Sequence, residues 1–238
     1  MTAPISRRER ERENRRRLML RAARTVFAER GYKHATVDEI AHRSEFAKGT
    51  IYNYFPNGKD EILFAILDDV YDEVYDLSVE AFEGPEGSSF AEALRRYVES
   101  TLAYFLREQD LFVIIMKEAN RLAFGDDPSK ATYFKDQFHR IISVLEPQIE
   151  RAIENGELRS YGGHAVAHMI LGNVHGYLRY HCLQKIGEQG VEDCEPLTAA
   201  EAAAFLSGML LHGLARTDGS RSGQSDEVER AVELEIDK

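Results

Sequence analysis

Residues 27–63 read FAERGYKHATVDEIAHRSEFAKGTIYNYFPNGKDEIL. Apolar side chains recur in this segment every three or four residues, which is the pattern of helices with one buried face. Gly31 is predicted to end a first helix over residues 13–30, because glycine accepts the backbone conformation that terminates a helix. Tyr32 is then placed to fold back onto Phe27.

A second helix is predicted to begin at Thr36. Its hydroxyl can accept a hydrogen bond from the amide of Glu39 while the Glu39 carboxylate accepts one from the amide of Thr36, which makes a capping box. This helix ends near Ser44, and a third helix covers residues 47–55. Two short helices joined by a tight turn indicate a helix-turn-helix, whose second helix enters the major groove of DNA.

The third helix, AKGTIYNYF, has a polar and aromatic outer face. Ile51 and Phe55 lie four residues apart and are predicted to pack inward. On the outer face a lysine can donate to guanine, an asparagine can pair with adenine, and a tyrosine can touch a thymine methyl group. Groups at the helix starts and flanks can hold phosphates. The predicted DNA-contacting residues are Lys48, Gly49, Tyr52 and Asn53 on the outer face, and Thr36, Thr50, Tyr54 and Lys59 at the flanks.

The segment resembles the TetR-type bacterial transcriptional regulators. The resemblance covers residues 22–67 and rests on FxxxGYxxxTVxxIA at residues 27–41, KGTIYxYF at residues 48–55 and KDEIL at residues 59–63. Two positions depart from the family pattern. Glu45 replaces the usual turn glycine, and Ala47 replaces the serine or threonine that usually caps the reading helix. We therefore expect a distorted turn, with a carboxylate near DNA that weakens binding or helps to select the sequence.

Helical patterns continue through the rest of the chain, and no alternating run predicts a strand. The expected fold class is all-α with about nine helices: an N-terminal three-helix helix-turn-helix domain and a larger C-terminal helical domain. Residues 1–58 would form a basic arm and the DNA-binding domain, residues 59–216 the effector-binding and dimerisation domain, and residues 217–238 a disordered acidic tail. Pro147 is expected to kink or split its helix. The remaining helices are predicted at residues 59–82, 90–108, 110–124, 128–155, 164–186 and 199–215.

Charge divides the chain into two parts. Residues 1–60 hold 14 Lys and Arg against 8 Asp and Glu, whereas the remainder holds 16 against 33. A basic module before an acidic one indicates that the first part meets a polyanion. Residues 5–17 contain seven arginines and three glutamates. We interpret them as a solvated, frayed extension of the first helix, and the alternative is an arm that tracks phosphates or enters the minor groove.

Several classes of protein are disfavoured. No apolar run reaches the ~20 residues that span a bilayer, and no apolar signal segment follows the basic start, so we expect a cytoplasmic protein without a membrane partner. Cys182 and Cys194 are too few for a disulfide framework. His164, His168 and His175 lie near one helix face, but no acidic or cysteine partner follows at a ligand spacing, so no metal site is predicted. The common catalytic and nucleotide-binding motifs do not occur in the sequence, and we expect neither an enzyme nor a cofactor.

The resemblance also implies a homodimer, in which the last two long helices pair with their copies, and a ligand cavity in each subunit. The predicted interface residues are small or apolar and allow close helix packing: Gly172, Gly176, Leu206, Met209 and Leu210. The candidate effector-binding residues are mostly apolar, although such side chains are more often ordinary core: Phe105, Phe112, Met116, Phe124, Tyr133, Phe134, Phe138, Met169, Asn173 and Tyr177.

The expected function is a ligand-responsive, sequence-specific transcriptional regulator. It would be a repressor that binds a palindromic double-stranded DNA operator as a homodimer and is released by a small, mostly apolar effector. Two alternatives stay open: a regulator without a small-molecule ligand, and a nonspecific nucleic-acid-binding protein that random DNA would compete away as well as operator.

Overall fold

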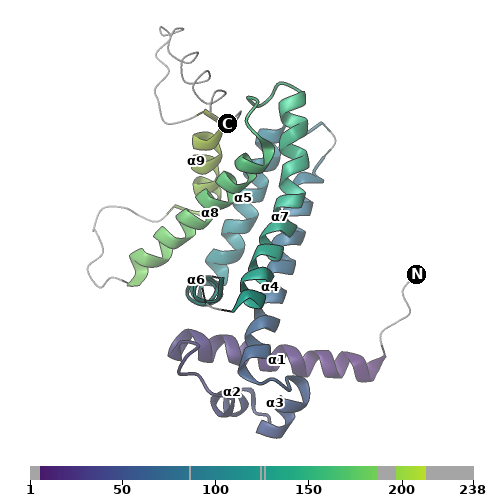
Figure 1. Ribbon diagram of the computed structural model, residues 1–238, viewed down its shortest axis with the longest axis vertical. Helices are drawn as coiled ribbons and strands as arrows, with labels where there is room; N and C mark the ends of the chain where they lie inside the picture. Colours follow the sequence, from purple (N-terminus) through teal and green to yellow (C-terminus); the bar gives the residue numbers. More distant parts are fainter. Residues whose placement is uncertain (1–5, 86, 124, 126, 187–196, 213–238) are drawn as a thin grey trace.

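The computed structural model describes residues 6–85, 87–123, 125, 127–186 and 197–212 (Figure 1). Over these residues the chain forms nine α-helices and no strand, which confirms the all-α fold class. The helices are α1 (Arg7–Arg30), α2 (Val37–Ser44), α3 (Lys48–Tyr54), α4 (Lys59–Phe82), α5 (Phe90–Arg107), α6 (Gln109–Ala123), α7 (Pro128–Glu154), α8 (Gly163–Ile186) and α9 (Ala199–His212). The predicted tail, residues 217–238, lies outside the described residues.

Helices α1 to α3 lie together at one end of the molecule, and α4 rises from them into the remaining helices (Figure 1). Gly31 ends α1 with a positive φ of 72°. The ring of Tyr32 packs edge-on against Phe27 with 5.4 Å between ring centroids, as the sequence predicted. The start of α1 was predicted wrongly, since the helix begins at Arg7 and not near residue 13. A capping box between Ser6 and Glu9 supplies hydrogen bonds for this earlier start.

The buried side chains form one continuous core from Met19 in α1 to Leu206 in α9. Helix α4 contributes to this core along its whole length, because it carries a buried residue in every turn from Ile62 to Ala81. It packs against α5 and α7, while α1 also packs against α6. The N-terminal three helices therefore meet the larger helical part at two places, α4 and α6.

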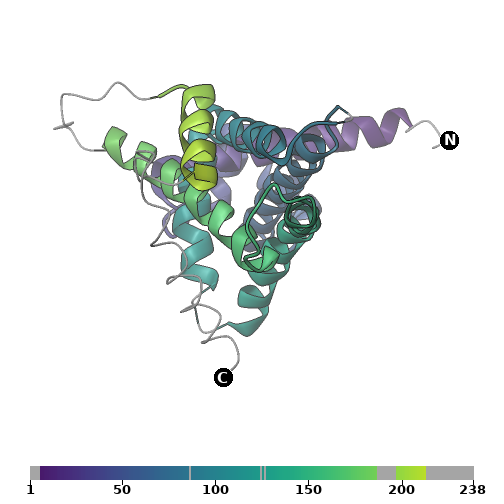
Figure 2. The same cartoon turned by 90° about the horizontal axis from the view of Figure 1, so that it is seen from above.

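Helix α7 stays helical through Pro147, so the predicted split of this helix is wrong. Pro147 is exposed, and the carbonyl that its missing N–H would have served can face water. Helix α9 packs mainly on α5, and its buried residues include Ala202 and Ala203, two small side chains that allow close approach. Viewed from above, α8 and α9 lie on the side of the molecule opposite the N-terminal end of α1 (Figure 2). Within the described chain, no helix is long and apolar enough to cross a bilayer.

Candidate DNA-binding surface

The turn between α2 and α3 keeps a regular helix-ending geometry in spite of its missing glycine. Glu45 takes the left-handed conformation, with φ 58° and ψ 28°, and is the one non-glycine residue with a positive φ among the described residues. The amide of Phe46 donates to the carbonyl of Ala41 at 3.1 Å, which closes the end of α2. The predicted distortion is therefore stored as backbone strain at one residue, because an L-residue is disfavoured in this conformation.

Helix α3 has a buried and an open face. Ile51 and Phe55 are almost fully buried, as predicted, and fix the helix in the core. Lys48, Gly49 and Asn53 are exposed, and a Cβ added to Gly49 would meet no atom within 4 Å. Another backbone or a base can thus come close to this turn of the helix.

The N-terminus of α3 has no side-chain cap. Ala47 stands at the N-cap position and offers no hydrogen bond to the amides of the first turn. The amide of Thr50 instead bonds to the Ala47 carbonyl at 2.8 Å, and Thr50 itself is half-buried. At the same end the Lys48 ammonium donates to the Asp38 carboxylate of α2 at 2.9 Å, and this hydrogen bond raises the pKa of Lys48. Both side chains stay largely exposed, so the lysine remains within reach of a ligand.

Tyr52 is 41% exposed and lies against the loop that follows α3. A Cβ added to Gly58 would come within 3.3 Å of Tyr52 Cε1, so a side chain at this position would crowd the ring. Gly58 also has a positive φ of 64°. Tyr54 is half-buried, and the guanidinium of Arg12 lies over its ring at 5.7 Å. The two tyrosines therefore both pack structurally, and Tyr52 still presents an exposed edge.

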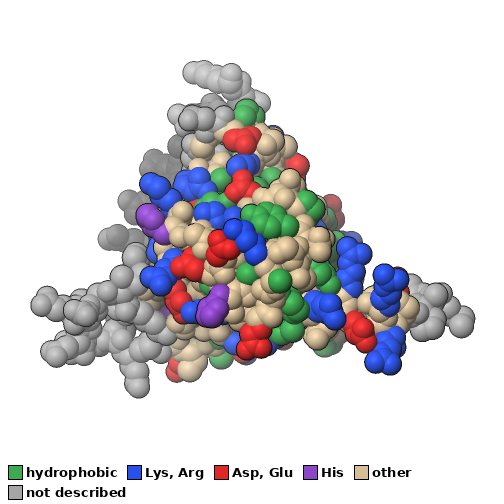
Figure 3. Space-filling view, turned by 90° about the horizontal axis from the view of Figure 1, so that it is seen from below, with side chains coloured by type: hydrophobic (Ala, Val, Ile, Leu, Met, Phe, Trp, Pro, Cys, Tyr) green, Lys and Arg blue, Asp and Glu red, His purple; other side chains and the backbone are tan. Residues whose placement is uncertain are grey.

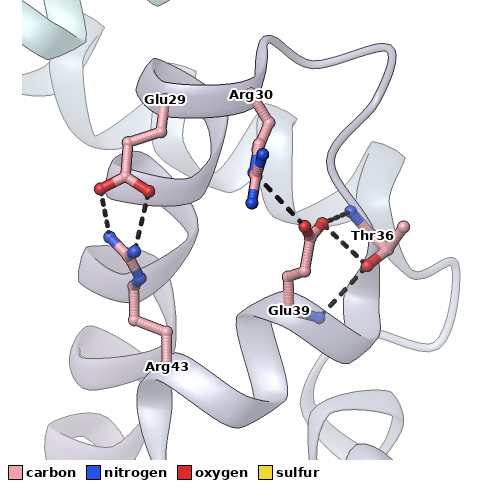
Figure 4. A network of polar contacts seen from close by, with 5 residues as sticks. All are labelled: Glu29, Arg30, Thr36, Glu39 and Arg43. Atoms are coloured by element: carbon pink, nitrogen blue, oxygen red, sulfur yellow. Dashed lines mark hydrogen bonds and ion pairs between the residues drawn. The ribbon is translucent and has the colours of Figure 1, made fainter.

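A polar network holds α2 against α1 (Figure 4). The Thr36 hydroxyl accepts from the amide of Glu39 at 3.2 Å, and the Thr36 amide donates to the Glu39 carboxylate at 2.9 Å, which confirms the predicted capping box. The Thr36 hydroxyl also donates to the Glu39 carboxylate at 2.9 Å, and this hydrogen bond together with the one from the Thr36 amide lowers the pKa of Glu39. Arg30 lies 3.6 Å from Glu39, and Arg43 donates two hydrogen bonds to Glu29 at 2.7 and 2.8 Å. The network fixes the position of Thr36 at the edge of the surface.

Lys59 is the predicted DNA-contacting residue whose surroundings agree least with that role. Its ammonium donates to the carbonyl oxygens of Tyr32 at 2.8 Å and Ala35 at 3.0 Å, and it lies 4.6 Å from the centroid of the Tyr32 ring. The lysine thus closes the loop between α1 and α2. The same ring is covered by Arg121 of α6 at 5.5 Å, and the Tyr32 hydroxyl donates to Asp60 of α4. Sequence reasoning missed this junction of α1, α4 and α6.

Seen from below, the face formed by α1 to α3 carries lysine and arginine side chains interspersed with acidic ones (Figure 3). Basic side chains gather on the projecting N-terminal end of α1 (Figure 3). The surface therefore combines the open face of α3 with a basic border, as an anion-binding surface requires.

Most of the predicted effector-binding residues belong to the hydrophobic core or pack against it. Phe105 and Phe112 are buried and pack edge-on at 5.3 Å between α5 and α6. Tyr133 packs against Phe64 of α4 at 4.9 Å and donates to Asp68 at 2.7 Å, so it joins α7 to α4. Phe134 is also buried, whereas Met116, Phe138, Asn173 and Tyr177 are partly buried.

Met169 and Phe124 differ from the other predicted effector-binding residues. Met169 is 62% exposed, so its prediction as a lining residue of an internal pocket is wrong. Its side chain lies on a face of α8 that no other described helix covers. Phe124 lies outside the described residues.

The predicted dimer-interface residues include exposed, partly buried and buried positions. Gly172 is exposed and Gly176 partly exposed, and neither has an atom within 4 Å of an added Cβ. Leu206 is 4% exposed and belongs to the core of its own subunit, so it leaves nothing for a partner to cover. Met209 and Leu210 are partly buried. Exposed large side chains that sequence reasoning missed for this surface are Met169, Tyr180 and, at 52% exposed, Phe205. We call Met169, Gly172, Gly176, Tyr180 and Phe205 the α8–α9 face.

The histidines of α8 lie close together without forming a metal site. His164 Nδ1 is 3.2 Å from Glu146 Oε2, and the Nε2 atoms of His164 and His168 are 3.2 Å apart. His175 turns away and packs edge-on against Phe138, and burial lowers its pKa. Over the described part of the chain, no three His, Cys, Asp or Glu side chains are arranged to hold a metal ion.

Comparison with known proteins shows what the N-terminal helices and the whole chain are similar to. Residues 19–66 match the sequence model of the family described as bacterial regulatory proteins, tetR family. The chain is 26% identical over 172 residues to the HTH-type transcriptional regulator HbdR of Aromatoleum sp. (strain CIB), and the match covers 71% of each protein.

Solved structures share the fold beyond the matched domain. One is the transcriptional regulator FadR from Bacillus subtilis in complex with stearoyl-CoA, with a TM-score of 0.70, 18% identity, and coverage of 84% of this chain and 99% of that chain. Another is AibR in complex with isovaleryl coenzyme A and operator DNA, with a TM-score of 0.63, 22% identity, and coverage of 83% and 98%. Residues 19–66 therefore form a helix-turn-helix domain of the tetR family of bacterial regulatory proteins, and the chain is similar over 71% of its length to a transcriptional regulator.

Proposed function

We propose that this regulator is a repressor that binds a palindromic DNA operator as a homodimer and releases it when a small, mostly apolar effector binds. The observation that carries the proposal is the open face of α3. Its inner residues are locked into the core, while Lys48, Gly49 and Asn53 have no covering element among the described residues. A rigid helix with a free polar face is what base reading in the major groove needs.

Each outer residue has a chemical role in this proposal. Asn53 pairs with adenine, Lys48 donates to a guanine acceptor, and the exposed edge of Tyr52 meets a thymine methyl group or a phosphate. When it binds DNA, Lys48 gives up its hydrogen bond to Asp38 and donates to a base instead. DNA sequences whose base acceptor compensates for the lost ion pair are therefore favoured. Thr36, Thr50 and Tyr54 border the helix and contribute to phosphate positioning. Lys59 acts indirectly, by holding the loop that ends at Ala35.

The α8–α9 face supports the homodimer. It carries three large exposed apolar or aromatic side chains, Met169, Tyr180 and Phe205, and such patches commonly mark interfaces. Glycine on its surface lets a second helix approach closely. A two-fold axis beside this face sets two α3 helices about 34 Å apart, or somewhat more, so that they reach successive major grooves.

The interior of the larger part supports an apolar effector. Aromatic side chains of α5 and α6 pack together there, and one buried polar atom of α7, Gln137 Oε1, has no hydrogen-bond partner among the described residues. An unpaired buried polar atom costs roughly 1–3 kcal/mol, which a ligand's polar group would recover. FadR and AibR were solved with acyl-CoA ligands. We therefore propose an acyl-CoA as the effector class, with the acyl chain as the apolar part that enters this interior.

Release would follow from a change in population between two arrangements. The effector favours the arrangement in which α4 and α6 have moved, and the Tyr32 junction passes this movement to the three N-terminal helices. Only an effector that binds one arrangement more tightly than the other can shift this balance. The two α3 helices then no longer match the spacing of the half-sites.

The test begins with a randomised duplex library incubated with the protein at near-physiological salt. We expect one palindrome to be enriched, and competition by random DNA as effective as by this palindrome would instead indicate nonspecific binding. Stearoyl-CoA and isovaleryl-CoA are then titrated into the complex of protein and labelled palindrome, with free coenzyme A as the control. Release by an acyl-CoA, without release by coenzyme A alone, is the expected result. Binding that no acyl-CoA alters would overturn the effector class and leave the operator intact.

The dimer is tested separately with Met169→Glu and Phe205→Glu, alone and combined. Each places a carboxylate on the α8–α9 face and leaves α3 unchanged. We expect the combined variant to sediment as a monomer and to lose affinity for the full palindrome. Lys135→Glu, an exposed change on α7 that reverses a charge, is the matched control. A combined variant that remains a dimer would place the interface elsewhere.

A further inference from the structure

The first turns of α1 project beyond the other N-terminal helices, on the side of the molecule away from α8 and α9 (Figures 1 and 2). Met19 is the first buried residue of the helix, so residues 7–18 precede the core. At a rise of 1.5 Å per residue this part of the helix is ~18 Å long. The capping box at Ser6 and an ion pair of 2.9 Å between Arg7 and Glu11 support it, so the predicted solvated extension of the first helix is present.

A groove of about 540 Å³ runs between this projecting segment and the end of α3. Arg8, Arg12 and Arg15 line its α1 wall at the spacing of a single helix face. Asn53 and Tyr54, the last two residues of α3, line the opposite wall. The groove therefore continues the proposed base-reading face toward the N-terminal segment.

The charge of the groove is positive although two glutamates also line it. Three arginines outnumber the two glutamates, and Glu11 is in addition paired with Arg7, which does not line the groove. Arg8 and Arg15 have no ion pair with any described residue, and the guanidinium of Arg12 lies over the Tyr54 ring.

Two other arginines of α1 form ion pairs within the protein. Arg16 and Arg24 lie 3.7 and 3.3 Å from the Asp69 carboxylate, and these ion pairs attach α1 to α4. Arg16 also lies over the ring of Phe55 at 5.9 Å. The helix thus carries one set of arginines that bind the protein itself and another set that faces an open groove.

We propose that this groove holds the sugar–phosphate backbone of the DNA that flanks each half-site, on the side away from the partner subunit. The inference rests on the proposed function, in which α3 lies in the major groove. A strand read by Asn53 continues past the end of α3 and so reaches the wall formed by Arg8, Arg12 and Arg15. The guanidinium group is always charged and donates two parallel hydrogen bonds to a phosphate. The operator that the protein recognises is therefore longer than its two base-read half-sites.

The experiment compares two variants of equal charge. Arg8, Arg12 and Arg15 are changed together to Gln in the groove variant. Arg10→Gln, Arg17→Gln and Arg21→Gln are combined in the control variant, since these three exposed residues lie on the opposite face of the helix. Affinity is measured from 50 to 200 mM salt on two duplexes of the selected palindrome. One duplex ends at the outer edge of the half-sites and the other extends by one helical turn on both sides.

On the long duplex, the slope of log affinity against log salt concentration is expected to be less steep by about 2.7 for the groove variant than for the wild type, if three phosphates are involved. The advantage of the wild-type protein over this variant then shrinks roughly 40-fold between 50 and 200 mM salt. On the short duplex the groove variant and the control variant are expected to bind alike.

Equal slopes for the two variants on the long duplex would overturn the inference, because they would show an effect of overall charge. So would a wild-type protein that binds both duplexes equally well. If the wild-type protein prefers neither duplex over random DNA, the proposed function fails, and the flanking contact fails with it. A preserved sequence preference with equal slopes refutes the flanking contact alone.

Discussion

Replacing Glu45 by glycine should stabilise the protein, although it removes a side chain. Glu45 holds a left-handed backbone conformation that costs an L-residue roughly 1–2 kcal/mol and costs glycine almost nothing. Against this relief stands the greater freedom of glycine in the unfolded chain, about 0.4–1 kcal/mol. The net gain is about 0.5–1 kcal/mol, which corresponds to a rise of about 1–4 °C in Tm for a chain of this size.

Urea denaturation at fixed protein concentration measures this change as a higher midpoint with an unchanged m value. Glu45→Gln is the matched control, because it removes the same charge but keeps the strained backbone. We expect stability to rise only in the glycine variant, and operator affinity to rise in both variants as the carboxylate leaves the DNA surface. A midpoint for Glu45→Gly that equals or falls below the wild-type value would refute the argument from strain.

Three further changes test the site. Ala47→Ser supplies the missing cap of α3 and should add about 1 kcal/mol to the free energy of unfolding, whereas an unchanged urea midpoint would contradict this. Lys59→Met removes the ammonium from the loop carbonyls and should lower the free energy of unfolding by roughly 1.5–3 kcal/mol. If the variant instead keeps wild-type stability and loses DNA affinity, Lys59 is a DNA contact. Hydrogen bonds from Thr36 lower the pKa of Glu39 from 4.5, so the folded state binds fewer protons than the unfolded chain, and stability is lost as pH falls below about 4.5. Glu39→Gln keeps the cap but cannot titrate, and its acid unfolding curve should fall less steeply than that of the wild type.

The N-terminal helices were the most predictable part, because their signals are local. The capping box at Thr36 depends on two residues three positions apart, and the contact of Tyr32 with Phe27 follows from the helix end at Gly31. The inward direction of Ile51 follows from helical periodicity alone. The start of α1 was placed too late, since a strongly charged segment has no apolar stripe to reveal its helix.

Contacts between distant segments could not be derived from the sequence. The role of Lys59 depends on carbonyl oxygens 24 to 27 residues away, and the position of Arg121 over Tyr32 depends on how α6 packs on α1. Met169 and Leu206 were assigned to the wrong surfaces for a related reason. An apolar residue on a helix looks the same in sequence whether it faces its own subunit or the outside.

The most direct test of the account compares the DNA selected by the wild-type protein with the DNA selected by Asn53→Ala. Asn53 is exposed on α3 and has no structural hydrogen bond to any described residue, so the variant should fold normally. We expect one palindrome for the wild type and the same half-site spacing for the variant, with base preference lost at one symmetry-related position in each half-site. No palindrome for the wild type, or identical base preferences for the two proteins, would contradict the claim that α3 reads the operator.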